Sequence, residues 1–264
     1  MDAKRKENFA MSVYNIVFSP TGGTKKVSDI FISSFGSGST FIDLCDRSID
    51  FSSFLFEPED VCVAAVPSYG GRVPAAALSR LGQMKGNGAM AVLFAVYGNR
   101  AYEDTLAELQ EQMEKAGFSC IAAAAAIAEH SIMRKFAAGR PDEKDAQEIA
   151  AFAAAVYNKI KAKDLSAHLN LPGSRPYREF GGVPMKPRAG KSCVECGLCA
   201  KKCPVGAIDA DHPSMTDAET CISCMRCLAV CPHKARSVNK ALLAAGSMKM
   251  KKACSDYKKN EMFF

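Results

Sequence analysis

Short apolar runs alternate with amphipathic stretches up to residue 161. The apolar runs predict buried strands over residues 13–18, 40–44, 60–66, 89–96 and 118–128. Between them, the helical spacing of apolar residues predicts helices over residues 25–35, 74–81, 102–116 and 141–161. The last strand contains an alanine run with high helix propensity, so only its alternation supports a strand. The pattern predicts an α/β fold with a doubly wound, five-stranded parallel sheet.

Three loops of this predicted sheet carry unusual residues. They cover residues 19–24, 67–73 and 97–102, each directly after a strand. In doubly wound sheets, ligands bind outside the carboxyl ends of the strands. We therefore expect the three loops to meet at one ligand site.

The first loop has the composition of a phosphate site. Gly22 and Gly23 let the backbone approach a ligand closely, and the following helix directs free N–H groups at an anion. Hydroxyl donors come from Ser19, Thr21 and Thr24. Neither the P-loop pattern nor G-x-G-x-x-G is present, which disfavours a nucleoside triphosphate or a dinucleotide. A phosphate monoester remains, and the alternative is an ordinary glycine-rich turn.

Eight cysteines form a repeat in the last third of the chain. The pattern C-x2-C-x2-C-x3-C-P occurs twice, and the second copy lies 28 residues after the first. This spacing is typical of bacterial iron–sulfur ligation. The alternatives are zinc, which prefers paired C-x2-C groups, and disulfides, which are typical of small secreted domains. The eight residues are Cys193, Cys196, Cys199, Cys203, Cys221, Cys224, Cys227 and Cys231.

Composition and charge limit where the protein can be located and what it can bind. The chain has 264 residues, 48% of them hydrophobic, and a formal net charge of +6. Eight Lys and Arg against two acidic residues follow from Lys234 onward, which predicts a basic tail. We find no apolar segment of the ~20 residues that span a membrane, no secretory signal and no nucleic-acid-binding module. Together with the reduced thiolates that iron–sulfur clusters need, this favours a cytoplasm, and the oxygen sensitivity of such clusters indicates an anaerobic one.

Composition also divides the chain. Residues 163–188 are rich in Pro and Gly and predict a stiff linker. The expected order is a polar extension, the α/β ligand-binding domain, the linker, the cysteine-repeat domain and the basic tail, over residues 1–11, 12–162, 163–188, 189–236 and 237–264. Residues 129–142 form an unusually long connection, expected either to cover the ligand site or to be a solvated loop.

The cysteine repeat resembles the two-cluster bacterial ferredoxins, a small α+β fold. In that family the fourth cysteine of each motif serves the other [4Fe–4S] cluster. The resemblance implies two ligand sets. The first set is Cys193, Cys196, Cys199 and Cys231; the second set is Cys221, Cys224, Cys227 and Cys203.

The three loops resemble those of flavodoxins, which bind FMN. The resemblance implies that Tyr69 and Tyr97 stack on the isoalloxazine ring, with Tyr102 as a third candidate. Further FMN contacts are implied for Ser19, Thr21, Gly22, Gly23, Thr24, Ser68, Gly70, Gly71, Gly98 and Asn99. The sequence departs from flavodoxins in lacking Trp and a marked acidic excess.

The whole chain resembles flavodoxin–ferredoxin fusions, the EFR1 family ferredoxins. This implies an electron-transfer protein relaying electrons between two [4Fe–4S] clusters and FMN, because clusters carry one electron and flavin one or two. Expected partners are other redox proteins, of acidic character if they dock at the basic tail. The alternatives are an FMN-dependent reductase, with His130 and Arg134 as weak catalytic candidates, and a redox sensor.

Overall fold

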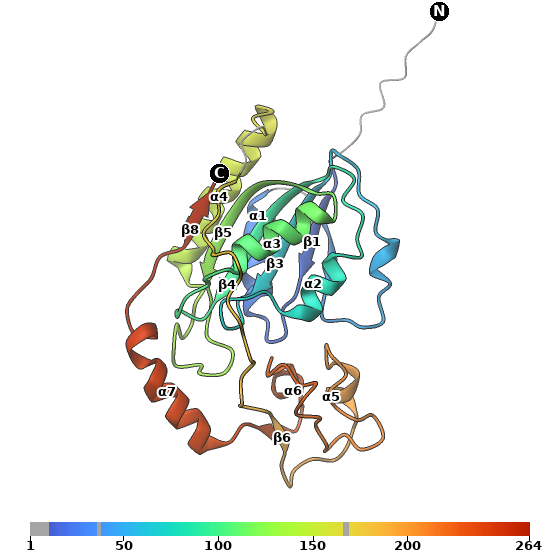
Figure 1. The fold of residues 1–264 in the computed structure, drawn as a ribbon, viewed down its shortest axis with the longest axis vertical. Coiled ribbons are helices and arrows are strands. Elements are labelled where there is room, and N and C mark those ends of the chain that lie inside the picture. The colour runs from blue at the N-terminus through green and yellow to red at the C-terminus, as the bar shows by residue number, and fades with distance from the viewer. Residues whose placement is uncertain (1–10, 36–37, 166–168) are drawn as a thin grey trace, which may run out of the picture.

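The N-terminal half is built around one twisted sheet (Figure 1). The computed structural model describes residues 11–35, 38–165 and 169–264, so most of the predicted N-terminal extension lies outside the described residues. The strand order is β2-β1-β3-β4-β5-β8. The first five strands are parallel, and 2-1-3-4-5 is the flavodoxin-like order. They are β1 (Val13–Val17), β2 (Ser39–Asp43), β3 (Val61–Pro67), β4 (Met90–Tyr97) and β5 (Ser119–Ile127).

Four helices cover the two faces of this sheet. Helices α1 (Gly23–Phe35) and α4 (Glu143–Lys161) pack on one face through Phe31 and Phe152. On the other face, α2 (Ala75–Leu81) and α3 (Thr105–Lys115) bury Leu81 and Leu109. A short 3-10 helix, η1 (Phe51–Ser53), lies between β2 and β3. Both faces are apolar, which explains the nearly continuous hydrophobic runs in the central strands.

The alanine-rich segment is a strand, as predicted, although alanine favours helices. Its residues from Ile121 to Ile127 are fully buried, and both faces of β5 contact a hydrophobic core. Burial between two helix layers therefore overrides local propensity.

The predicted five-stranded sheet has a sixth strand. Strand β8 (Glu261–Phe263) pairs antiparallel with β5, at the sheet edge. The Asn260 side chain reinforces the pairing, because its Oδ1 accepts the Ile127 N–H at 3.0 Å. Sequence patterning missed β8 because three residues carry no periodic signal. Its physical role is to cover an otherwise open strand edge.

The cysteine-rich part, residues 188–237, is a small two-fold repeat of its own. Strands β6 (Arg188–Ala189) and β7 (Arg236–Ser237) pair antiparallel, and helices α5 (Leu198–Lys201) and α6 (Arg226–Ala229) occupy equivalent places in the two copies. The backbone repeats with the sequence. Positive φ angles recur 28 residues apart, at Glu195 (54°) and Ser223 (55°), Gly197 (73°) and Met225 (63°), and Gly206 (71°) and Lys234 (47°).

The predicted basic tail returns to the first half of the molecule. Helix α7 (Lys240–Cys254) follows the cysteine-rich part, and the chain then runs up to β8 (Figure 1). Gly246 of α7 packs so closely on Met133 and Met185 that a Cβ there would collide with their methyl carbons. The lysines of α7, Lys249 among them, stay exposed. In the described residues, no helix has the length and apolar character to cross a membrane.

Candidate functional site

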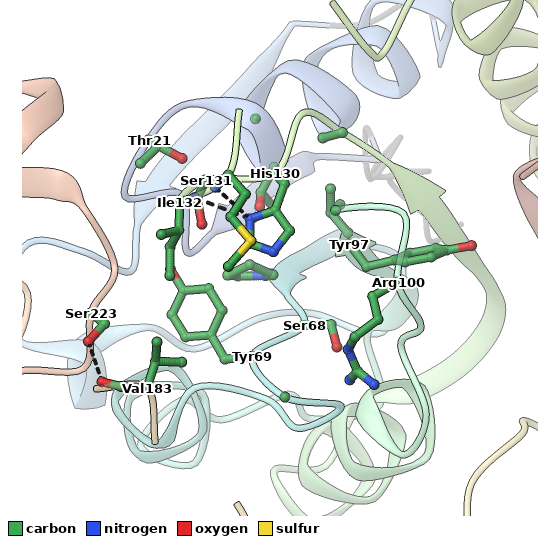
Figure 2. Close-up of a pocket in the computed structure, with 18 of the residues that line it drawn as sticks. Thr21, Ser68, Tyr69, Tyr97, Arg100, His130, Ser131, Ile132, Val183 and Ser223 are labelled. Carbon is green, nitrogen blue, oxygen red and sulfur yellow. Dashed lines mark hydrogen bonds between the residues drawn. The ribbon is translucent and has the colours of Figure 1, made fainter. Parts of the chain in front are cut away.

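A cavity of about 200 Å³ lies at the carboxyl ends of β1, β3 and β4 (Figure 2). All three loops singled out in the sequence contribute to its wall, as does the segment after β5. Three further segments also line it: the linker through Phe180 and Val183, the second cysteine motif through Ile222 and Ser223, and α7 through Met250. The cavity is therefore shared by both halves of the chain.

The phosphate loop is organised by local hydrogen bonds. Ser19 Oγ accepts the Lys25 N–H at 2.9 Å, and Gly22 turns the chain with φ of +94° before α1 begins. Thr21, Gly23 and Thr24 line the cavity, whereas Gly22 and Ser19 are not among the residues that do. Because the first N–H groups of a helix have no partner within it, this end of the cavity is suited to an anion.

The three tyrosines differ in position. Tyr69 lines the cavity, and burial raises its pKa well above the usual value, with added contributions from the charges of Cys224 and Cys45. Tyr97 borders the cavity, but in Figure 2 its ring extends away from Tyr69. It packs on Tyr102, with ring centroids 5.4 Å apart. Tyr102 is not a lining residue, and its hydroxyl donates to Glu261 of β8 at 2.9 Å.

In the glycine-rich loops after β3 and β4, some of the residues predicted to contact FMN line the cavity and others do not. Ser68, Gly70 and Gly98 line the cavity. Gly71 instead faces Glu103, whose carboxylate a Cβ at this position would overlap. The Asn99 amide is also turned away, because its Nδ2 donates to the carbonyls of Cys254 and Asp256, each at 2.8 Å. Asn99 thus holds the loop after β4 to the end of α7.

The two weak catalytic candidates, His130 and Arg134, differ in their position relative to the cavity. His130 lines the cavity against Gly98, and its Nδ1 accepts the N–H groups of Ile132 and Met133, both at 3.2 Å. In the neutral ring, Nε2 therefore carries the proton. Burial lowers the His130 pKa, which favours this neutral form. Arg134, in contrast, is 79% exposed and paired with Glu129, outside the cavity wall.

Sequence reasoning missed several members of the wall. Arg100 lines the cavity and is held by Glu103, whose Oε1 accepts from its Nη1 at 2.9 Å. Its only sequence signal was its place in the loop after β4. Phe180 and Met250 carried no signal, because segments far along the chain from that loop bring them in.

The eight repeat cysteines surround two further spaces. One is lined by Cys193, Cys196, Cys199 and Cys231, and the other by Cys203, Cys221, Cys224 and Cys227. These are the two sets implied by the ferredoxin resemblance, each with three cysteines from one copy and the fourth from the other. In the described part of the chain, no three His, Cys, Asp or Glu converge as the ligands of a single ion do.

The second cysteine copy is attached to the flavodoxin-like half. Ser223 Oγ donates to the Val183 carbonyl at 2.9 Å. Arg226 reaches the phosphate loop and β2, with its Nη1 3.4 Å from the Ser19 carbonyl and its Nη2 3.4 Å from Asp43. From the other side, Arg80 Nη2 donates to the Pro204 carbonyl at 2.6 Å. These contacts hold one thiol set beside the cavity.

The cysteine-rich part of the chain is similar in sequence to known iron–sulfur proteins. Residues 192–235 match the family model of the 4Fe-4S dicluster domain. A curated relative, a component of the ion-translocating oxidoreductase complex of Methanosarcina acetivorans, is 43% identical over 44 residues. This match covers 16% of the chain and 17% of the relative, so the chain spans about a sixth of that protein's length. The chain carries a ferredoxin-type 4Fe–4S domain.

Solved structures resemble the other half. A flavodoxin of Streptococcus pneumonia is 20% identical, covering 56% of this chain and 99% of its own, with a TM-score of 0.42. Flavodoxin 1 of Bacillus cereus is 17% identical, covering 56% and 97%, with a TM-score of 0.42. Rubredoxin oxygen:oxidoreductase of Desulfovibrio gigas is 16% identical, covering 60% and 37%, also at 0.42. The flavodoxin-like assignment of the fold rests on the strand order described above.

Proposed function

We propose that this chain is an electron-transfer protein that binds one FMN and two [4Fe–4S] clusters and relays electrons between them. A redox role follows from its two domains, a flavodoxin-like sheet and a ferredoxin-type domain. The cofactor count and the relay are the proposal. The observation that carries it is the cavity wall, to which the phosphate loop and the second cysteine motif both contribute.

The residues of the cavity fit FMN. Thr21, Gly23 and Thr24, at the start of α1, offer hydroxyl and backbone donors to a phosphate. Tyr69 offers an aromatic face for stacking on a flavin ring. The cavity is smaller than the ~300–1,000 Å³ of typical ligand pockets. However, Phe180 lies over Gly70 and is 39% exposed, so its ring can turn outward without leaving a buried void.

The thiol sets fit two cubane clusters. Each set draws three sulfurs from one short loop and the fourth from the other copy, which is the ferredoxin pattern. When bound, the clusters carry single electrons and the flavin accepts one or two, so their pairing connects one-electron carriers to two-electron chemistry. The chain contributes by holding the groups together, through the Arg226 contacts to Ser19 and Asp43.

A second candidate function is an FMN-dependent reductase of a small molecule. It is favoured by His130, a half-buried, neutral ring whose tautomer is fixed by two backbone N–H groups. His130→Asn should abolish turnover of such an enzyme while FMN stays bound, whereas the electron relay should be unaffected. Arg134→Gln is the matched control in the same loop, because Arg134 lies outside the cavity wall.

The relay is tested on protein purified without oxygen. Iron, acid-labile sulfide and released FMN should correspond to two clusters and one flavin per chain. After rapid mixing with dithionite, cluster absorbance should bleach before the flavin absorbance does. Protein that contains clusters but binds no FMN would contradict the proposal and leave a ferredoxin with a large recognition module.

We further propose membership of the EFR1 family, an anaerobic cytoplasmic setting, and acidic redox partners at the basic residues after Lys234. The exposed lysines of α7 support such a partner, because they leave positive charge on the surface of this helix.

A further inference from the structure

The two thiol sets are related by sequence but differ in their surroundings. We propose that the second set, Cys203, Cys221, Cys224 and Cys227, is the flavin-side set, and that Ile222 and Ser223 form its contact with the flavin cavity. The first set then faces the exterior. This inference rests on the proposed function, because it assigns an order to the sites that the relay requires.

The 28-residue repeat provides matched positions for this comparison. Val194 and Ile222 each follow the first cysteine of a motif, and Cys196 and Cys224 are each the second cysteine. Val194 is 59% exposed and Cys196 is exposed. Ile222 is partly buried in the cavity wall, and Cys224 is buried. Residues at matched positions of the two copies, which are of the same type, are thus exposed in the first copy and at least partly buried in the second.

Side-chain contacts fix the second copy against the cavity. Ser223, which lines the cavity, is tied to the linker through its bond to Val183. The Lys186 ammonium also donates to the Cys221 carbonyl from that linker. On the flavin side, Tyr69 lines the same cavity as Ile222 and Ser223.

The first copy makes different contacts. Its Glu195 accepts from Ser214 Oγ at 2.7 Å, and Cys199 Sγ lies 3.8 Å from the Pro213 carbonyl, so these two contacts stay within the cysteine-rich part. Its end, at Cys203 of the second set, reaches the flavodoxin-like half, where Arg80 donates to the Pro204 carbonyl. Among the described residues, those that line the flavin cavity include none from the first copy, residues 193–203. The first set is consequently the set that an external one-electron carrier can approach.

Selective removal of each set tests the assignment. Cys196→Ala should leave only the second cluster and Cys224→Ala only the first, each in the full-length chain under anaerobic conditions. The midpoint potential of the remaining cluster is measured by titration followed by electron paramagnetic resonance, with and without FMN. Because potential depends on nearby charge and on solvent access, FMN should shift the potential in Cys196→Ala and not in Cys224→Ala. The opposite pattern, or equal shifts, would overturn the assignment.

FMN affinity tests the same assignment without removing a cluster. Ile222→Asp should raise the Kd for FMN roughly tenfold or more, because it adds a carboxylate to the cavity wall, whereas Val194→Asp should leave the Kd unchanged. Should Ile222→Asp fail to fold, Ile222→Ala and Val194→Ala provide the same comparison, with a smaller increase of roughly threefold expected for Ile222→Ala alone. If the Ile222 and Val194 variants changed the Kd for FMN equally while the wild-type protein still bound FMN and relayed electrons, the proposed order of the sites would be refuted. Wild-type protein that binds no FMN would refute the proposed function itself.

Discussion

The two cysteine copies have the same cysteine spacing and the same pattern of positive φ angles, yet among the described residues only the second copy lines the cavity at the carboxyl ends of β1, β3 and β4. The residues that differ lie between or beside the ligands. Where the first copy has Glu195 and Leu198, the second has Ser223 and Arg226, which bind the linker and the phosphate loop. Ligand spacing therefore specifies which cofactor a copy can bind, and the intervening side chains specify what that cofactor faces.

After Ile222→Asp, the largest effect on this asymmetry is expected from Arg226→Leu. It places in the second copy the residue type found at the equivalent position of the first. Arg226 is 14% exposed and lies beside Asp43, so its loss should destabilise the fold by about 1–2 kcal/mol, between the values for exposed and buried pairs. Anaerobic urea unfolding followed by circular dichroism measures the change. Lys201→Leu, an exposed position in α5, is the control and should be neutral.

Ser223→Ala removes a single contact between the second copy and the linker. One hydrogen bond between neutral groups contributes about 0.5–1.5 kcal/mol, so the expected loss of stability is smaller. The same unfolding assay applies. Ser214→Ala removes the matching bond of the first copy, which is exposed, and should have less effect. A larger loss from Ser214→Ala than from Ser223→Ala would argue against the asymmetry.

The smallest expected effect is a pH dependence that originates at the flavin cavity. The folded-state pKa of His130 is lowered by burial, so the folded chain binds fewer protons there than the unfolded chain. Stability linked to His130 is complete above the unfolded pKa of ~6.5 and is lost as the pH falls from there through the folded pKa. Urea midpoints at pH 7.5 and pH 6.0 should differ less in His130→Asn than in wild type. An unchanged difference would show that His130 does not contribute.

The sequence predicted the central sheet well because burial on both faces leaves long apolar runs, such as residues 60–66 and 89–96. It predicted the phosphate loop for a similar reason, since the glycines, the hydroxyls and the helix start are adjacent in the chain. It failed for β8, whose position depends on the free edge of β5. It also failed for Phe180, Ile222 and Met250, because distant segments carry them into the cavity wall.

Among the tyrosines, spacing offered no means of ranking Tyr69, Tyr97 and Tyr102. All three follow a strand end, where a flavin contact is reasonable. The structure separates them because Tyr102 has a partner in β8, Glu261, and draws the Tyr97 ring toward itself. Both rings therefore depend on a segment far along the chain, whereas Tyr69 lines the cavity together with Ile222 and Ser223 of the second cysteine copy.

Local patterns were sufficient for the parts whose chemistry is local: the two cysteine motifs, the phosphate loop and the order of strands and helices. Each depends on residues that are near neighbours in the chain, where backbone geometry links spacing to shape. The folded molecule was needed to establish which thiol set lies beside the cavity, which tyrosine faces it and where the basic tail runs. Those outcomes depend on contacts between segments far apart in the chain, such as Arg226 with Ser19 and β8 with β5, and no local pattern encodes such contacts.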